Sequence, residues 1–166
     1  MTPLPGPRPL MLKLIGEPFQ ILAPRSGFTL TDGGENWRNL AFGPTPKTGS
    51  LRVQAARILP FADCSGIDGT ILLRDMEKRP NILGGLCHGA GLLEAAASIP
   101  DEVIQTNGYF VFPHHVKAMQ NDEDERALLC LFRVPGVKNM PAHGWLDRWN
   151  YLERGFSERA HVLLHA

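Results

Sequence analysis

A cysteine and a histidine stand side by side in a glycine-rich stretch of the chain. Residues 81–83 are Asn-Ile-Leu, a short apolar run, and residues 84–91 hold four glycines around Cys87 and His88. A strand, a sharp turn between small residues and a helix are the parts of a nucleophile elbow. Because the start of a helix favours a negative charge, this pattern predicts a lowered pKa for the Cys87 thiol and a nucleophilic thiolate.

The same stretch, residues 81–96, resembles the Cys-His-Gly elbow of the DJ-1/PfpI superfamily, where the cysteine is the nucleophile or redox centre. The resemblance implies Cys87 as the nucleophile and His88 as the residue next to it. In a cysteine-dependent enzyme, His88 or another histidine would be the base. The amides of residues 88–91 would then form an oxyanion or anion site. A structural cysteine at a tight helix start, with glycines that admit close backbone packing, explains the pattern without chemistry.

Histidines and carboxylates suggest metal sites, but their spacing does not support one. His114 and His115 are adjacent, so their side chains diverge on a strand and on a helix alike. His161 and His165 would share a helical face, yet no glutamate stands between them as in the zinc-binding His-Glu-x-x-His pattern. The four carboxylates of residues 122–125 lack the central glycine of an EF-hand loop. We therefore expect no metal site and no cofactor.

Aromatic residues form two candidate binding surfaces. Tyr109, Phe110 and Phe112 lie on one expected strand with Lys117 beyond it, which would suit base stacking beside a cation and hence single-stranded nucleic acid. Simple core packing is the other interpretation of this strand. Trp145 and Trp149 share one side of an amphipathic pattern over residues 145–152, which predicts a helix. Tryptophans on an uncovered helix would be binding hot spots.

Composition and charge narrow the class of protein. Seventeen basic and seventeen acidic residues give no net charge, which removes a whole-chain electrostatic attraction to nucleic acid or to anionic membranes. The charge is nevertheless polarised, because residues 1–60 carry a net +4 and residues 61–166 a net −4. The three cysteines match no disulfide framework, and no apolar run approaches the ~20 residues that span a bilayer. We expect a cytoplasmic protein with no membrane partner.

The expected elements are mostly strands. Prolines at every second position from 3 to 9 predict an extended amino-terminal arm over residues 1–10. Residues 51–58 fit a strand and a helix equally well, and a helix from residue 86 or later ends before Pro100. Further strands are expected at residues 11–15, 19–23, 27–31, 37–42, 109–112, 127–134 and 161–164.

These elements predict a single α+β domain over residues 11–166. Its sheet is expected to be mostly antiparallel or mixed, with two or three helices. No complete set of nucleophile, base and orienting group can be assembled from the motifs. The leading interpretation is therefore a non-enzymatic binding or assembly protein that contacts a larger protein or nucleoprotein complex. A cysteine-dependent hydrolase, amidase or redox protein is the first alternative, and single-stranded nucleic-acid binding is the second.

Overall fold

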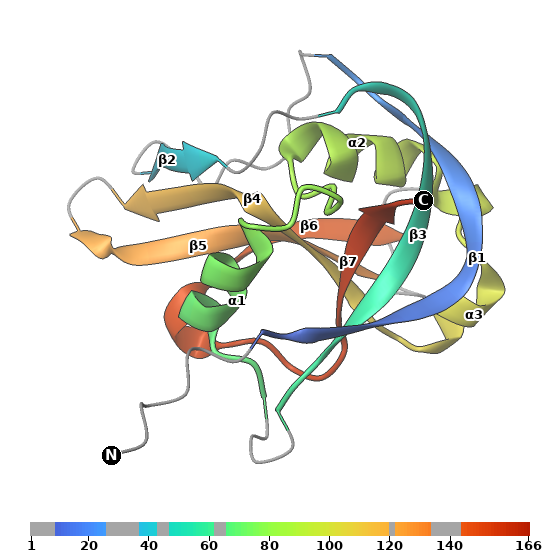
Figure 1. The fold of residues 1–166 in the computed structure, drawn as a ribbon. Coiled ribbons are helices and arrows are strands. Elements are labelled where there is room, and N and C mark those ends of the chain that lie inside the picture. Colours follow the sequence, from blue (N-terminus) through green and yellow to red (C-terminus); the bar gives the residue numbers. More distant parts are fainter. Residues whose placement is uncertain (1–8, 26–36, 43–46, 62–65, 120–121, 134–143) are drawn as a thin grey trace.

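The computed structural model describes residues 9–25, 37–42, 47–61, 66–119, 122–133 and 144–166 (Figure 1). Within these residues the chain forms one mixed sheet of seven strands with three α-helices. This architecture agrees with the expected α+β class. Most of the proline-rich arm and the strand expected at residues 27–31 lie outside the described residues, as does Cys64.

The strands follow the order β1-β3-β7-β4-β5-β6, and β2 pairs with the far half of β4. The β4 and β7 strands run parallel, and every other pair is antiparallel. The strands are β1 (Met11–Ala23), β2 (Trp37–Phe42), β3 (Gly49–Leu59), β4 (Tyr109–Met119), β5 (Asp122–Arg133), β6 (Trp145–Tyr151) and β7 (Ala160–His165). The helices are α1 (Gly69–Met76), α2 (Leu86–Glu94) and α3 (Asp101–Gln105), with short 3-10 turns η1 (Ala96–Ser98) and η2 (Leu152–Arg154).

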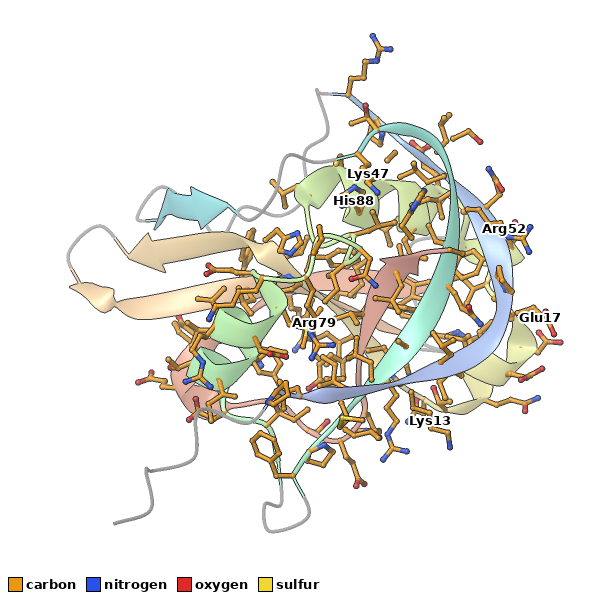
Figure 2. The ribbon with its side chains drawn as sticks, in the orientation of Figure 1. Lys13, Glu17, Lys47, Arg52, Arg79 and His88 are labelled. Carbon is orange, nitrogen blue, oxygen red and sulfur yellow. The ribbon has the colours of Figure 1, made fainter. Side chains whose placement is uncertain are left out.

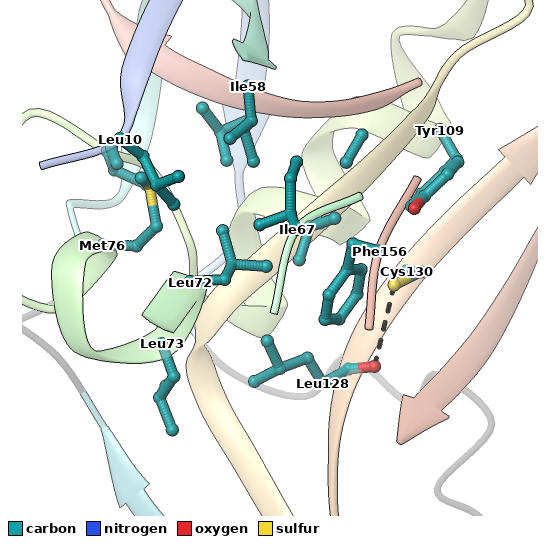
Figure 3. Close-up of a cluster of buried hydrophobic side chains, with 14 of the residues drawn as sticks. Leu10, Ile58, Ile67, Leu72, Leu73, Met76, Tyr109, Leu128, Cys130 and Phe156 are labelled. Carbon is teal, nitrogen blue, oxygen red and sulfur yellow. Dashed lines mark hydrogen bonds between the residues drawn. The ribbon is translucent and has the colours of Figure 1, made fainter. Parts of the chain in front are cut away.

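Both faces of the sheet are covered, so the central strands are apolar on both sides. In β4, Tyr109 and Val111 pack on the face that carries α1, whereas Phe110 and Phe112 pack on the face that carries α2 and α3. Figure 3 shows the α1 side, where Leu72 and Met76 meet strand side chains. Complete burial of each such side chain contributes about 1.5–3 kcal/mol. These two apolar layers hold the sheet in place.

The ambiguous segment at residues 51–58 is part of strand β3. Its neighbours Ala55 and Ala56 are both fully buried, one on each face of the sheet. A strand that is buried on both sides loses the polar alternation by which it would be recognised. This double burial explains why the sequence pattern there fitted a helix as well.

The strands expected at residues 11–15 and 19–23 are two halves of one long strand, β1. The pairing with β3 shifts register between Ile15 and Phe19, and Gly16 adopts φ +70° at this irregularity. A β-carbon at Gly16 would also approach Val103 of α3 to 3.0 Å. A glycine is therefore needed at this position, where the strand bends without ending.

The helix predicted over residues 145–152 is wrong, because Trp145–Tyr151 form strand β6. This strand pairs with β5 from Trp145 opposite Arg133 to Tyr151 opposite Ala127. Residues four apart share one face in a strand as they do in a helix, so the tryptophan spacing could not separate the two. Only η2, the turn that follows, is helical.

The residue before β1, Leu10, is already part of the packed core. Leu10 is 2% exposed, although we assigned it to the arm. Its amide donates to the Asp75 carboxylate on α1 at 3.2 Å, and the Arg79 guanidinium donates to its carbonyl and to the same carboxylate. These bonds tie the start of β1 to the end of α1.

Candidate functional site

The glycine-rich stretch follows a short strand-like segment between β7 and β4. The Leu83 amide donates to the Leu163 carbonyl at 2.8 Å, and the His114 amide donates to the Gly84 carbonyl at 3.0 Å. A β-carbon at Gly84 would lie 2.9 Å from the His114 ring, and one at Gly91 would lie 2.8 Å from the Leu22 carbonyl oxygen. Close packing therefore accounts for two of the glycines that suggested an elbow.

His88 holds the start of α2 to a distant segment. Its Nδ1 accepts the Gly85 amide proton at 3.0 Å, and its Nε2 lies 2.7 Å from the Lys47 carbonyl oxygen. Because a carbonyl only accepts, Nε2 carries the proton and the ring is neutral. Burial lowers the pKa of His88, against the bond to Lys47, which raises it. Both nitrogens are occupied, so neither is left to take a proton from Cys87.

The Cys87 thiol does not have the lowered pKa that the elbow pattern predicts. Its side chain is half-buried in the first turn of α2, and burial raises its pKa. Hydrogen bonds from the amides of His88 and Cys87 act in the opposite direction but are the smaller effects. The expected direction of the shift is therefore wrong, since loss of water outweighs the helix start.

The aromatic strand belongs to the core. Phe110 and Phe112 are 1% and 0% exposed, and the Tyr109 ring stacks on Phe132 with centroids 4.6 Å apart. The Tyr109 hydroxyl accepts the Ser157 amide proton at 2.9 Å. These rings are not available to stack on bases, so the predicted stacking platform is wrong. Lys117 lies on β4 opposite Ala127, and its side chain is outside the described part.

The two tryptophans share one face of β6 but do not form an exposed pair. Trp145 is 4% exposed and packs against Phe110 with centroids 5.8 Å apart. It lines an open cavity of about 570 Å³ together with residues of η1 and α3. Trp149 is partly buried on the same apolar cluster. Their burial indicates a contribution to the core.

The remaining candidates do not assemble into a metal centre. The Nε2 of His114 lies 3.2 Å from the Met76 carbonyl, and the ring is buried. The side chains of residues 122–125 lie outside the described part of the chain. Among the residues that the structure describes, no three histidine, cysteine or acidic side chains lie together as ligands. No described helix is both long enough and apolar enough to cross a membrane.

Strand β1 carries a feature that the sequence patterns did not single out. The exposed large apolar side chains of the described residues are Met11, Leu14 and Leu22, at 57–64% exposure, and all three lie on β1. This strand also stands at the end of the strand order. Edge strands with exposed apolar side chains are sites of association between chains. The available signal was residues 10–15, where Lys13 is the single polar residue, because this stretch lacks the polar alternation of a half-exposed strand.

Comparisons with known protein families, curated proteins and solved structures found no match to this chain.

Proposed function

We propose that this chain is a binding protein that contacts a partner protein along the first half of β1, Met11 to Ile15. The observation that carries the proposal is the exposure of Met11 and Leu14 on the end strand of the sheet. The occupant is an extended segment of the partner that adds to β1 as a further strand. Main-chain hydrogen bonds then supply affinity, and alternate side chains supply specificity.

The side chains of this half would contact an added strand on both faces. Leu14 lies opposite Ala56 of β3 and so shares the face of α1. Met11 and Lys13 share the other face, because successive strand side chains alternate. In the described part of the chain, the main chain of Met11 to Ile15 has its hydrogen bonds with β3 alone. A partner strand would therefore cover apolar surface on both sides of the edge.

The charge of this half favours an acidic partner. Lys13 projects from β1 into solvent (Figure 2) and lies opposite Arg57 of β3. The residues 11–15 hold no acidic side chain, and Glu17 follows only after the bend. An acidic side chain on the partner strand would face this pair of cations. We therefore infer a partner segment in which apolar and acidic residues alternate.

The second half of β1 offers a matched control. Its Leu22 carbonyl lies against Gly91 of α2, where a β-carbon would approach within 2.8 Å. The helix thus covers this half, although the Leu22 side chain is 60% exposed. The main chain at Leu22 is covered by α2, whereas the main chain at Leu14 is not covered by any helix of the described residues. The same substitution at the two positions therefore distinguishes strand addition from nonspecific hydrophobic binding.

The proposal fits a protein of a reducing compartment such as the cytoplasm. Cys87 and Cys130 are both free thiols, and Cys130 is fully buried. Free thiols are typical of cytosolic proteins. A cysteine-dependent activity has less support than binding, because both nitrogens of His88 are occupied and burial raises the pKa of Cys87.

The experiment measures amide shifts in labelled protein on titration with short synthetic peptides. One peptide alternates valine with aspartate, a second alternates valine with lysine, and a third repeats the first with methylated backbone nitrogens. We expect only the first to shift the amides of residues 11–15. Leu14→Lys should weaken its binding about tenfold or more, whereas Leu22→Lys should leave it unchanged.

Three results would overturn the proposal. Shifts outside β1, or equal binding of the methylated peptide, would show that no strand is added. Dimerisation at rising protein concentration that Leu14→Lys abolishes would instead assign this edge to a second copy of the chain. Sedimentation of the wild type and of both lysine variants distinguishes these outcomes.

A further inference from the structure

One buried histidine has a ring nitrogen without a partner. His161 of β7 is 1% exposed, and its Nδ1 lies 2.7 Å from the Arg159 carbonyl oxygen. Because the carbonyl accepts, Nδ1 carries the proton, and the neutral ring presents a lone pair at Nε2. This Nε2 atom is buried and has no hydrogen bond with any residue that the structure describes. Leaving a buried polar atom unpaired costs stability, so its retention needs a reason.

The ring is held in place by its surroundings. A β-carbon at Gly108 would lie 2.2 Å from the Cε1 atom of His161, so only glycine permits this contact. The Phe110 ring lies beside the His161 ring, with their centroids 6.0 Å apart and their planes tilted by 55°. With Nδ1 bonded as well, the ring cannot turn freely to satisfy Nε2 elsewhere. The unpaired nitrogen is thus a fixed feature of the site.

The histidine borders an open cavity of about 270 Å³, which is just below the usual size of small-molecule pockets. A cavity of this size suits a ligand of few atoms. Its lining residues are Ile15, Arg57, Thr106, Glu158, Arg159 and His161.

Positive charge dominates around the cavity. Arg57 lies directly opposite His161 in the β3–β7 pairing, and Lys13 of β1 lies opposite Arg57, so the three share one face of the sheet. The Nε–H group of Arg57 donates to the Glu158 carbonyl at 2.9 Å. This bond steadies the guanidinium, and within the described residues it leaves the terminal amino groups for a ligand. Glu158 is the one acidic residue in the lining, and it is exposed.

We propose that this cavity binds a small anion that also carries a hydroxyl group, such as hydrogen phosphate or an α-hydroxycarboxylate. The guanidinium groups of Arg57 and Arg159 pair with the anionic oxygens, as arginine does with carboxylate and phosphate. Nε2 of His161 is closed to solvent, so a side chain of the lining moves aside for the ligand hydroxyl to donate to this atom and satisfy it. This inference goes beyond the proposed partner surface, because it needs no partner strand.

The experiment uses two matched pairs of probes on the whole protein at neutral pH. Hydrogen phosphate and sulfate are both tetrahedral anions, but only hydrogen phosphate has an O–H group. Glycolate and acetate are both small carboxylates, but only glycolate has a hydroxyl. Binding is followed through the ring nitrogen resonances of His161 in histidine-labelled protein. We expect the hydroxyl-bearing member of at least one pair to bind about tenfold more tightly than its counterpart.

Variants separate the site from a general attraction of anions. Arg57→Met should weaken the binding of the tighter probe about tenfold or more, since a charged donor is lost. Arg159→Met is a second test at an exposed position, in case the first variant folds poorly. Arg52→Met is the matched control, because Arg52 is an exposed residue of the same strand (Figure 2) and lies outside this cavity. It should leave binding unchanged.

Each outcome decides the proposal. If only hydrogen phosphate binds more tightly than its counterpart, the cavity is a site for phosphoryl ligands. If only glycolate does, the cavity is a site for hydroxy acids. Equal binding within both pairs would overturn the role of His161. No response of its Nε2 resonance to any probe would show that the cavity holds only solvent. Because no peptide is present, failure here would leave the test of the β1 surface unaffected.

Discussion

His88 and His161 are both buried histidines whose pKa is lowered chiefly by burial, yet they differ in how their ring nitrogens are used. His88 bonds to Gly85 on its own helix and to Lys47, far away in the sequence, so the ring joins two segments. Within the described part of the chain, the His161 ring bonds only to Arg159, two residues before it, and its Nε2 has no partner. The two bonds of His88 indicate a structural role, whereas the unpaired nitrogen of His161 is the observation on which the proposed anion site rests.

The largest expected effect comes from removing the structural histidine. His88→Leu leaves the Gly85 amide and the Lys47 carbonyl without their partner, so we expect a loss of about 3 kcal/mol in the free energy of unfolding. Urea denaturation measures this loss. His165→Leu, at an exposed position of β7, should change stability by less than about 0.5 kcal/mol. If the two variants lost the same free energy of unfolding, His88 would have no special structural role.

Acid should destabilise the protein, because His88, His114 and His161 all have lowered pKa values in the folded state. Their stabilising contribution is complete above the unfolded pKa of about 6.5 and is lost as the pH falls below it, since the unfolded chain takes up protons first. Each histidine contributes a slope of up to about 1.4 kcal/mol per pH unit. Urea midpoints measured between about pH 5 and 8 test this expectation. Stability that stays flat or rises below about pH 6 would contradict it.

The smallest effect is expected at the histidine with the unpaired nitrogen. His161→Phe keeps the contact with Phe110 and removes a buried unpaired atom, at the cost of the bond to Arg159. These changes oppose each other, so we expect the free energy of unfolding to change by less than about 1 kcal/mol. The variant should also show a smaller loss of stability in acid than the wild type. A loss as large as that of His88→Leu would make His161 a structural residue too.

Much of the secondary structure could be predicted from local patterns. Strands β2, β4 and β7 were expected near their observed positions, and Pro100 stands where the helical segment that includes α2 and η1 ends. Helix α1 was missed, although Asp68 caps it by accepting the amide protons of Thr70 and Ile71 at 2.9 and 3.1 Å. An aspartate three residues before the apolar run Ile71–Leu73 was the local signal. Strand β6 was misassigned because its tryptophans share one face under either periodicity.

The candidate sites were harder to predict than the elements. Cys87 and His88 are neighbours in the sequence, yet the His88 ring is occupied by Lys47, a contact across 41 residues. Arg57 and His161 are far apart in the sequence, yet they lie opposite each other because β3 pairs with β7. The exposed edge at Met11 and Leu14 likewise follows from the place of β1 in the strand order.

By itself, the sequence determined the α+β class, most of the strands and the glycines at close contacts, because these depend on periodicity and backbone conformation within a few residues. Only the tertiary structure decided which strand is an edge, which histidine is satisfied and where arginines surround a cavity. These properties depend on strand order and on hydrogen bonds between distant segments, such as the one between His88 and Lys47. No local pattern encodes them, since the same residue type can occupy a bonded or an unpaired position.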